Sequence, residues 1–142
     1  MTDTYIWGKL CERLVTTIAK YDEEYSKNST IIFPNDTDYS DANELWFEVF
    51  PLHTQPTQIE LGSSGRNRWT LGMQININAP RPAKLGTDDV DLAYDTIAAN
   101  FKRGDIFDGI RVLQTASRSS ARVQKDYYSV PVTVMVQADM DN

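Results

Sequence analysis

The residues that could perform chemistry in this chain are few, and their spacing matches no catalytic pattern. His53 is the single histidine and Cys11 the single cysteine. A Ser-His-Asp or Cys-His device would have to use His53, which lies between two prolines in a segment that predicts a turn. Cys11 falls on the apolar stripe of a predicted helix, which favours a packed thiol over a nucleophile. We therefore expect no catalytic residues and no enzymatic activity, with a small hydrolase using His53 beside Asp and Glu as the alternative.

Two further segments have residue types that bind metals or phosphates elsewhere. Asp88, Asp89 and Asp91 resemble a divalent-metal site, but they fall in the first turn of a predicted helix, where the helix dipole itself favours anions. The usual zinc ligands are lacking. The glycine-rich segment GSSGRN at residues 62–67 has no P-loop lysine, and no helix is predicted directly after it. We expect no metal and no cofactor.

Length and charge predict one domain, residues 1–142, that is not a general nucleic-acid binder. The chain is 41% hydrophobic and 24% charged, with a formal net charge of −6. At this length a sizeable core can form. The negative charge disfavours general binding to nucleic acid or anionic lipid. No signal-peptide pattern is present, and no apolar run approaches the roughly 20 residues that span a bilayer, so we expect a cytoplasmic protein.

The elements that must position any functional residue centre on a strand at residues 68–78. Apolar and polar residues alternate there with a period of two, which predicts a half-buried antiparallel strand. Helices are predicted at residues 4–25 and from Thr87 or Asp88 to Arg103, with Gly104 as the stop. Lys102 and Arg103 would counter the dipole of the second helix.

The remaining periodic segments predict more strands around this central one. They are residues 29–34, residues 44–52 (ended by Pro51), residues 58–61, residues 105–115 and residues 126–138. Pro131 indicates an edge or a bulge, residues 116–125 a loop, and the last residues a frayed tail. This order predicts an α+β fold: a mostly antiparallel sheet with two helices on one face and a projecting β-hairpin arm at residues 58–78. The other face would be wetted or covered by a partner.

Charge is distributed unevenly along the chain. Residues 1–60 contain eleven acids and four bases, whereas residues 61–84 contain only bases, namely Arg66, Arg68, Arg81 and Lys84. This polarity suits head-to-tail self-assembly, although a scattered solvated surface is the plainer explanation. Arg118 and Arg122 lie on a second predicted loop. We interpret Arg66, Arg68, Arg81, Arg118 and Arg122 as residues that contact an acidic protein surface, with DNA phosphates as the weaker alternative.

The stretch WFEVFPLHTQPTQIELGSSGRNRWTLGMQININAPRPAKLG, followed by an Asp-rich amphipathic helix and a Tyr-Tyr-x-Val-Pro-Val-x-Val strand, resembles the tail terminator proteins of long-tailed bacteriophages and prophages. The matching positions are Phe47 to Pro51, Leu61, Gly62, Arg68, Gly72, Gln74, Ile75, Pro80 and Gly86. The family has a glycine after the proline that follows the central strand. Residues 81–84 depart from that pattern, which leaves the conformation of this loop open.

The resemblance implies a structural protein without catalysis. It implies a homo-oligomeric ring, a hexamer in the family, that caps the tail tube, stops its polymerisation and offers a surface to the head–tail connector. The tail-tube protein and the connector would be its partners, and it would act in the bacterial cytoplasm during assembly and in the virion tail. Two alternatives are a monomeric neck or tail-completion protein and a small ligand- or nucleic-acid-binding α+β module.

Overall fold

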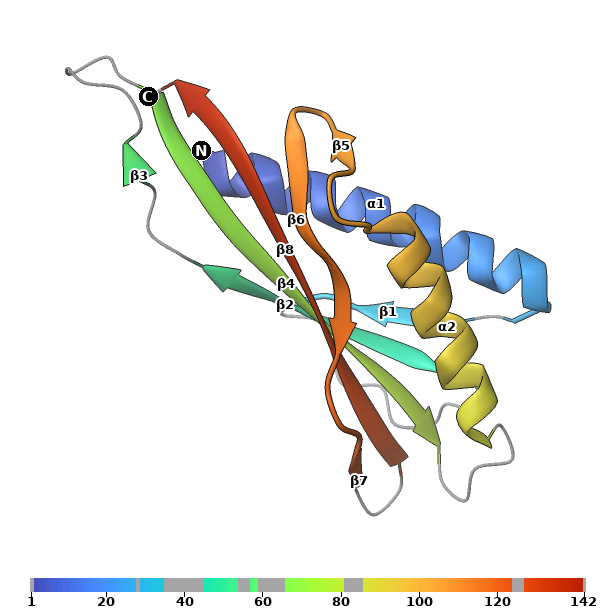
Figure 1. The fold of residues 1–142 in the computed structure, drawn as a ribbon. Helices are drawn as coiled ribbons and strands as arrows, with labels where there is room; N and C mark the ends of the chain where they lie inside the picture. The colour runs from blue at the N-terminus through green and yellow to red at the C-terminus, as the bar shows by residue number, and fades with distance from the viewer. Residues whose placement is uncertain are drawn as a thin grey trace.

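One sheet, covered on one face by two helices, forms the architecture (Figure 1). The sheet runs in the order β1-β2-β4-β8-β6-β5, with β3 paired to β4 and β7 to β8. Among the described strands, only β1 and β2 pair in parallel, so the predicted α+β class with a mostly antiparallel sheet is confirmed. This computed structural model describes residues 2–27, 29–34, 45–53, 57–58, 66–80, 86–123 and 127–141.

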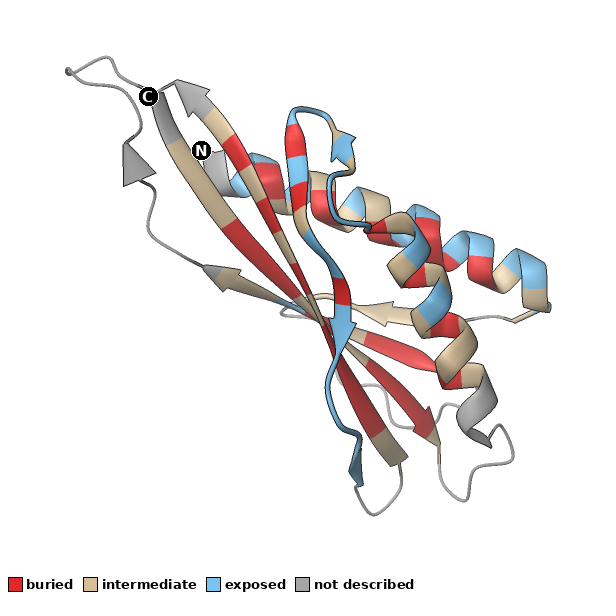
Figure 2. Cartoon of the chain, in the orientation of Figure 1, coloured by how far each residue is buried: buried red, intermediate tan, exposed pale blue. Residues whose placement is uncertain are grey.

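The centre of the sheet is a long ladder between β4 (Arg66–Pro80) and β8 (Tyr127–Asp141). It runs from the pair of Arg66 with Asp141 to the pair of Pro80 with Tyr127. The predicted alternation is confirmed, because the helix-facing residues of β4 from Leu71 to Ala79 are at most 2% exposed. Valines at alternate positions of β8 complete the buried layer beneath the helices (Figure 2).

Helix α1 (Thr2–Tyr25) is the first helix that the sequence predicts. Its end is formed by Ser26, whose φ of 55° is left-handed, and by a hydrogen bond from the Lys27 backbone N–H to the Asp22 carbonyl oxygen. This is the hydrogen-bonding pattern of a Schellman motif. The Asp22 carboxylate also accepts hydrogen bonds from the backbone and hydroxyl of Ser29, so this acid fixes the exit from the helix.

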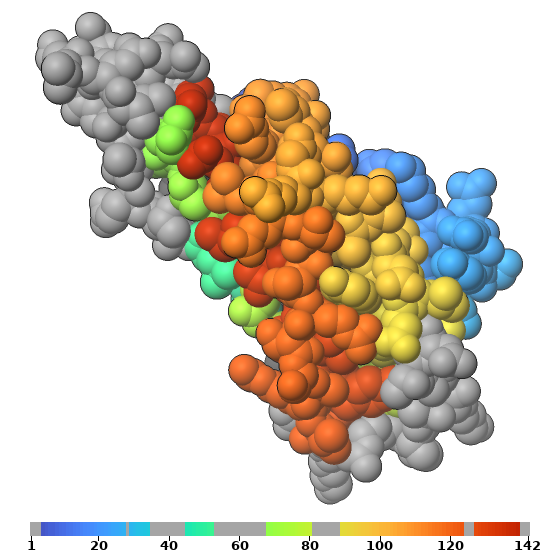
Figure 3. Space-filling view, viewed as in Figure 1, coloured from blue at the N-terminus to red at the C-terminus, as the bar shows by residue number. Residues whose placement is uncertain are grey.

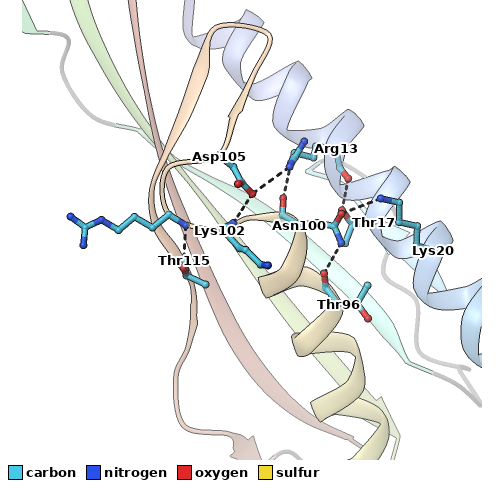
Figure 4. A network of polar contacts seen from close by, with 9 residues as sticks. Arg13, Thr17, Lys20, Thr96, Asn100, Lys102, Asp105 and Thr115 are labelled. Atoms are coloured by element: carbon cyan, nitrogen blue, oxygen red, sulfur yellow. Dashed lines mark hydrogen bonds and ion pairs between the residues drawn. The ribbon is translucent and has the colours of Figure 1, made fainter.

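Helix α2 (Gly86–Asn100) ends three residues earlier than predicted. Lys102 and Arg103 therefore lie beyond it, and Gly104, at a φ of 90°, belongs to the following turn. The cation at the helix end comes instead from α1, since Arg13 Nε donates a 2.7 Å hydrogen bond to the Asn100 carbonyl oxygen (Figure 4). The predicted role of Lys102 and Arg103 was wrong, because a tertiary contact supplies the charge.

A hairpin replaces the single strand predicted at residues 105–115. Strands β5 (Ile106–Phe107) and β6 (Ile110–Arg118) are joined by Asp108 and Gly109, with φ values of 51° and 80°. Positive φ at both central residues is the mark of a type I′ turn, for which Asp-Gly is a preferred sequence. Part of the predicted loop at residues 116–125 also forms strand, because β6 continues to Arg118 and β7 (Arg122–Val123) pairs with β8.

Pro51 does not end its strand as predicted. Strand β2 (Trp46–His53) pairs with β4 through His53, and Pro51 stands opposite Met73. Among the described residues, β1 (Thr30–Ile32) flanks β2 only as far as Glu48. Pro51 thus lies where β2 is an edge strand, the position in a sheet that tolerates a missing donor.

Pro131 lies in a central strand, opposite Asn76 of β4, rather than at an outer edge. Its carbonyl oxygen accepts a 2.8 Å hydrogen bond from the Ser119 N–H, on the side where β6 gives way to β7. Because the N and O atoms of one residue in an antiparallel strand point to the same side, the missing donor falls at this break in the neighbouring strand. The predicted edge or bulge at Pro131 itself was wrong, because β8 passes through this residue in regular register with β4 and the break lies in the neighbouring strand.

Candidate assembly surfaces

A two-stranded ribbon, which we call the arm, extends past the strands that flank the central ladder. The arm consists of residues 66–70 of β4 and residues 138–141 of β8. Strand β2 pairs with β4 only as far as Leu71, and β6 pairs with β8 only as far as Gln137. Within the described part of the chain, β3 (Thr57–Gln58) alone flanks the arm (Figure 1).

The arm differs in composition from the predicted hairpin. Residues 59–65, which include most of the expected strand at residues 58–61 and most of the expected loop, lie outside the described residues. The partner of β4 in the arm is the end of β8, where a frayed tail was expected. The arm is thus built from segments far apart in the sequence.

Arg68 and Asp139 form a bidentate ion pair across the arm. Arg68 Nε lies 2.9 Å from Asp139 Oδ1, and its Nη2 lies 3.2 Å from Oδ2. The hydrogen bond to Asp139, followed by its charge, raises the pKa of Arg68 above its ordinary value. Both side chains are partly exposed, so the pair adds little stability, but its planar geometry favours one register of the two strands. Arg66 stands opposite Asp141 in the same ladder.

Arg118 and Arg122 lie at the other end of the sheet. Arg118 Nη1 is 2.7 Å from Asp91 Oδ1 on α2, and the guanidinium lies 5.3 Å from the centroid of the Tyr94 ring. The Tyr94 hydroxyl donates a 2.8 Å hydrogen bond to the Ala116 carbonyl oxygen, which holds the ring beneath the arginine. Arg122 is exposed on β7.

The predicted arginines therefore belong to two separate surfaces. Arg66 and Arg68 begin β4, whereas Arg118 and Arg122 lie beside the end of β4 and the start of β8. Fourteen residue steps of extended strand separate these ends by about 45 Å. Arg81 lies outside the described residues.

The sheet face opposite the helices, which we call the open face, combines packed and polar regions. Gly72 lies so close to its neighbours that a Cβ there would be 2.7 Å from Met135 Sδ and 2.9 Å from Leu52 Cβ. Phe50 on the same face is 41% exposed. Asn78 Nδ2 donates a 2.8 Å hydrogen bond to Glu48 Oε1. This polar pair shares the open face with the apolar side chains of Leu52, Met135 and Phe50.

Cys11 and His53 are the residues considered for catalysis, and with the Asp and Glu side chains they are also the possible metal ligands. Burial raises the pKa of the Cys11 thiol to about 11, so the half-buried sulfur stays protonated at neutral pH. His53 is the last residue of β2, and its side chain is outside the description. Among the described residues, no three His, Cys, Asp or Glu side chains gather closely enough to hold a metal ion. Neither described helix is long and apolar enough to cross a membrane.

Comparison with known proteins supports the fold. No protein-family model and no curated protein matches the chain. Twelve chains of solved structures match it. One of them, whose name states no function, aligns over 89% of this chain and 93% of its own with a TM-score of 0.53 and 16% identity. At this identity the likeness shows a shared fold alone.

Proposed function

We propose that this chain is a structural protein of bacteriophage or prophage tail assembly, similar to the tail terminators. In this proposal, copies of the chain form a ring that caps the tail tube, stops its polymerisation and offers a surface to the head–tail connector. The tail-tube protein and the connector are the partners, and the finished ring resides in the virion tail. The sequence resemblance is the origin of this proposal.

The residues that carry the resemblance have coherent structural roles. Residues 47–51 of β2 pair directly with residues 73–77 of β4, so the two halves of the motif form one ladder. Gly72 permits close packing with Leu52 and Met135, and Arg68 joins the arm strands through Asp139. Pro80 ends β4 and Gly86 begins α2. These residues shape the sheet and do not form a reactive site. Such roles are what we expect in an assembly protein.

The projecting arm is the observation on which the proposal rests. An isolated two-stranded ribbon is marginally stable in water, because it has too little apolar surface to bury. Backbone groups on the sides of the arm that no described strand flanks favour pairing or packing with another chain. A ribbon of this kind, with the Arg68–Asp139 ion pair across it and β3 as its flanking strand among the described residues, is suited to contact a neighbouring subunit or the tube.

Two measurements test the proposal. The first is the mass of the purified chain in solution by light scattering, where we expect a closed oligomer. The second adds the chain to polymerising tail-tube protein of the same phage and measures tube length by electron microscopy, where we expect shorter, uniform tubes. A monomer that still binds tube ends would favour the neck or tail-completion alternative. A monomer without effect on the tubes would overturn the proposal.

A charge-reversal variant at Arg68 tests the role of the arm in the same assays. Arg68→Glu places like charges opposite Asp139 and should weaken assembly while the fold persists, as circular dichroism would show. Lys20→Glu makes the same charge change on the exposed side of α1, where Lys20 Nζ contacts Asn100 Oδ1. Equal oligomer size in wild type and Arg68→Glu would count against a role for the arm.

A further inference from the structure

One flank of the sheet carries a concentration of bases, in which Lys102, Arg103 and Arg111 join the predicted Arg118 and Arg122. Residues 101–123 form the connection after α2 together with β5, β6 and β7. We call this flank the basic edge. All five of its bases are exposed, namely Lys102, Arg103, Arg111, Arg118 and Arg122. Of its two acids, Asp105 is turned toward Arg13, at 3.7 Å, which leaves Asp108 as the exposed acid.

The basic edge is a continuous outer surface rather than a buried strand. Figure 3 shows residues of β6 and β7 as a ridge along the face toward the viewer, and Figure 2 shows that this strip is largely exposed. Among the described residues, no acid forms an ion pair with Arg103, Arg111 or Arg122. These three cations are therefore available to a partner.

Backbone pairing is not the mode of contact that this edge favours. The Val112 N–H donates to the Asp105 carbonyl oxygen, the Gly104 N–H donates to the Val112 carbonyl oxygen, and the Ala116 N–H donates to the Phe101 carbonyl oxygen. The chain after α2 thus already occupies much of the outer hydrogen-bonding side of β6. A partner would be recognised mainly through charged side chains.

Charge complementarity identifies a second copy of this chain as the fitting partner. The basic edge has five bases and two acids, which give it a formal charge of +3. Because the net charge of the whole chain is −6, the remaining residues together carry −9. On the other side of α2, the C-terminal end of α1 presents Glu23 and Glu24, both exposed. Lys27, the base that follows them, is engaged with Asp89 at 3.6 Å.

We infer that the basic edge of one copy docks against the acidic C-terminal end of α1 in the next copy. The two surfaces differ, so the contact is heterologous, and repeated contacts of this type close into a ring when the rotation between copies allows it. This inference rests on the proposed function and specifies which surfaces hold neighbouring subunits together. Opposite charges across such a contact fix its register and speed encounter.

The test reverses charges on both surfaces of the full chain. Arg111→Glu with Arg122→Glu should raise the dissociation constant of the oligomer at least about tenfold, measured by sedimentation at low salt. Glu23→Lys with Glu24→Lys should do the same, and mixing the two double variants should restore mixed oligomers. Lys9→Glu is the control, because it reverses a charge near the other end of α1, outside both surfaces, and it should assemble like wild type.

The outcomes separate this inference from the proposed function. A wild-type ring that survives both double reversals would overturn the inference and leave ring assembly intact. Loss of assembly in the Lys9 control as well would overturn it, because net charge rather than these surfaces would then be responsible. A wild-type chain that stays monomeric would refute self-association altogether. Salt-sensitive binding of duplex DNA by such a monomer, lost in the Arg111 and Arg122 variant, would assign the basic edge to nucleic acid instead.

Discussion

Arg13 of α1 binds the end of α2: its Nε atom lies 2.7 Å from the carbonyl oxygen of Asn100. The same guanidinium lies 4.5 Å from the centroid of the Phe107 ring and 3.7 Å from Asp105 (Figure 4). One side chain therefore joins both helices to the β5–β6 hairpin. A cation at this position also stabilises the partial negative charge at the helix C-terminus.

We expect Arg13→Met to lower the free energy of unfolding by about 1–3 kcal/mol, because the helix end loses a charged donor. Arg13→Lys keeps the charge but loses the planar donor geometry, so its loss should be smaller. Urea denaturation followed by circular dichroism measures both. A stability of Arg13→Met within about 0.5 kcal/mol of wild type would show that the contact is incidental.

Gly72 and Gly8 should respond oppositely to the same substitution. Gly72→Ala places a methyl group within 2.9 Å of both Met135 and Leu52, and overpacking of this kind costs about 1–3 kcal/mol. At Gly8, within α1, a Cβ would meet nothing within 4 Å. Gly8→Ala should therefore stabilise by about 0.5–1 kcal/mol through helix propensity. Thermal unfolding compares the two variants. A destabilised Gly8→Ala would contradict the finding that a methyl group at Gly8 of α1 has open space around it.

Ile75→Asp should unfold the domain or destabilise it by more than about 4 kcal/mol. The Ile75 side chain is fully buried beneath the helices, and a carboxylate there would have no partner. Gln74→Asp makes a comparable change one residue away, on the open face, and should be tolerated far better. Similar unfolding midpoints for the two variants would refute the assignment of faces along β4.

Cys11 should be a slow nucleophile in the folded chain. Burial raises its pKa from 9.0 to about 11, so at pH 8 the thiolate fraction should be about 100-fold lower than in the unfolded chain. Alkylation by iodoacetamide, with and without urea, measures this ratio. The neutral thiol also stabilises the fold fully below pH 9, and this contribution is lost as the pH rises to about 11. Cys11→Ala should lack that part of the alkaline destabilisation.

Sequence periodicity predicted the main helices and strands of this fold, because the spacing of apolar residues along each element shows which of its faces is buried. Alternation along residues 68–78 and the three-and-four spacing from Ile6 to Tyr21 each report one apolar face. The Asp108–Gly109 turn was also readable, since Asp-Gly between two apolar runs is a strong hairpin signal. It was missed because residues 105–115 were interpreted as one run.

The contacts of the candidate surfaces were not readable from sequence alone. Arg68 meets Asp139 only because β4 and β8 pair in one register, and the two residues are 71 positions apart. Arg13 meets Asn100 only because α1 and α2 pack side by side. The basic edge likewise arises when the connection after α2 folds beside β6. Each depends on tertiary placement, which a periodic pattern does not encode.

The β4–β8 ladder has a consequence for the kinetics of folding. The nearest pair in this ladder, Pro80 with Tyr127, is separated by 47 positions in the chain, and the most distant, Arg66 with Asp141, by 75. Loops of this length must close before β4 and β8 gain contact energy from each other, which slows folding toward the millisecond-to-second range. Until then the edge of β4 that meets β8 is unpaired, so high expression at elevated temperature should favour inclusion bodies.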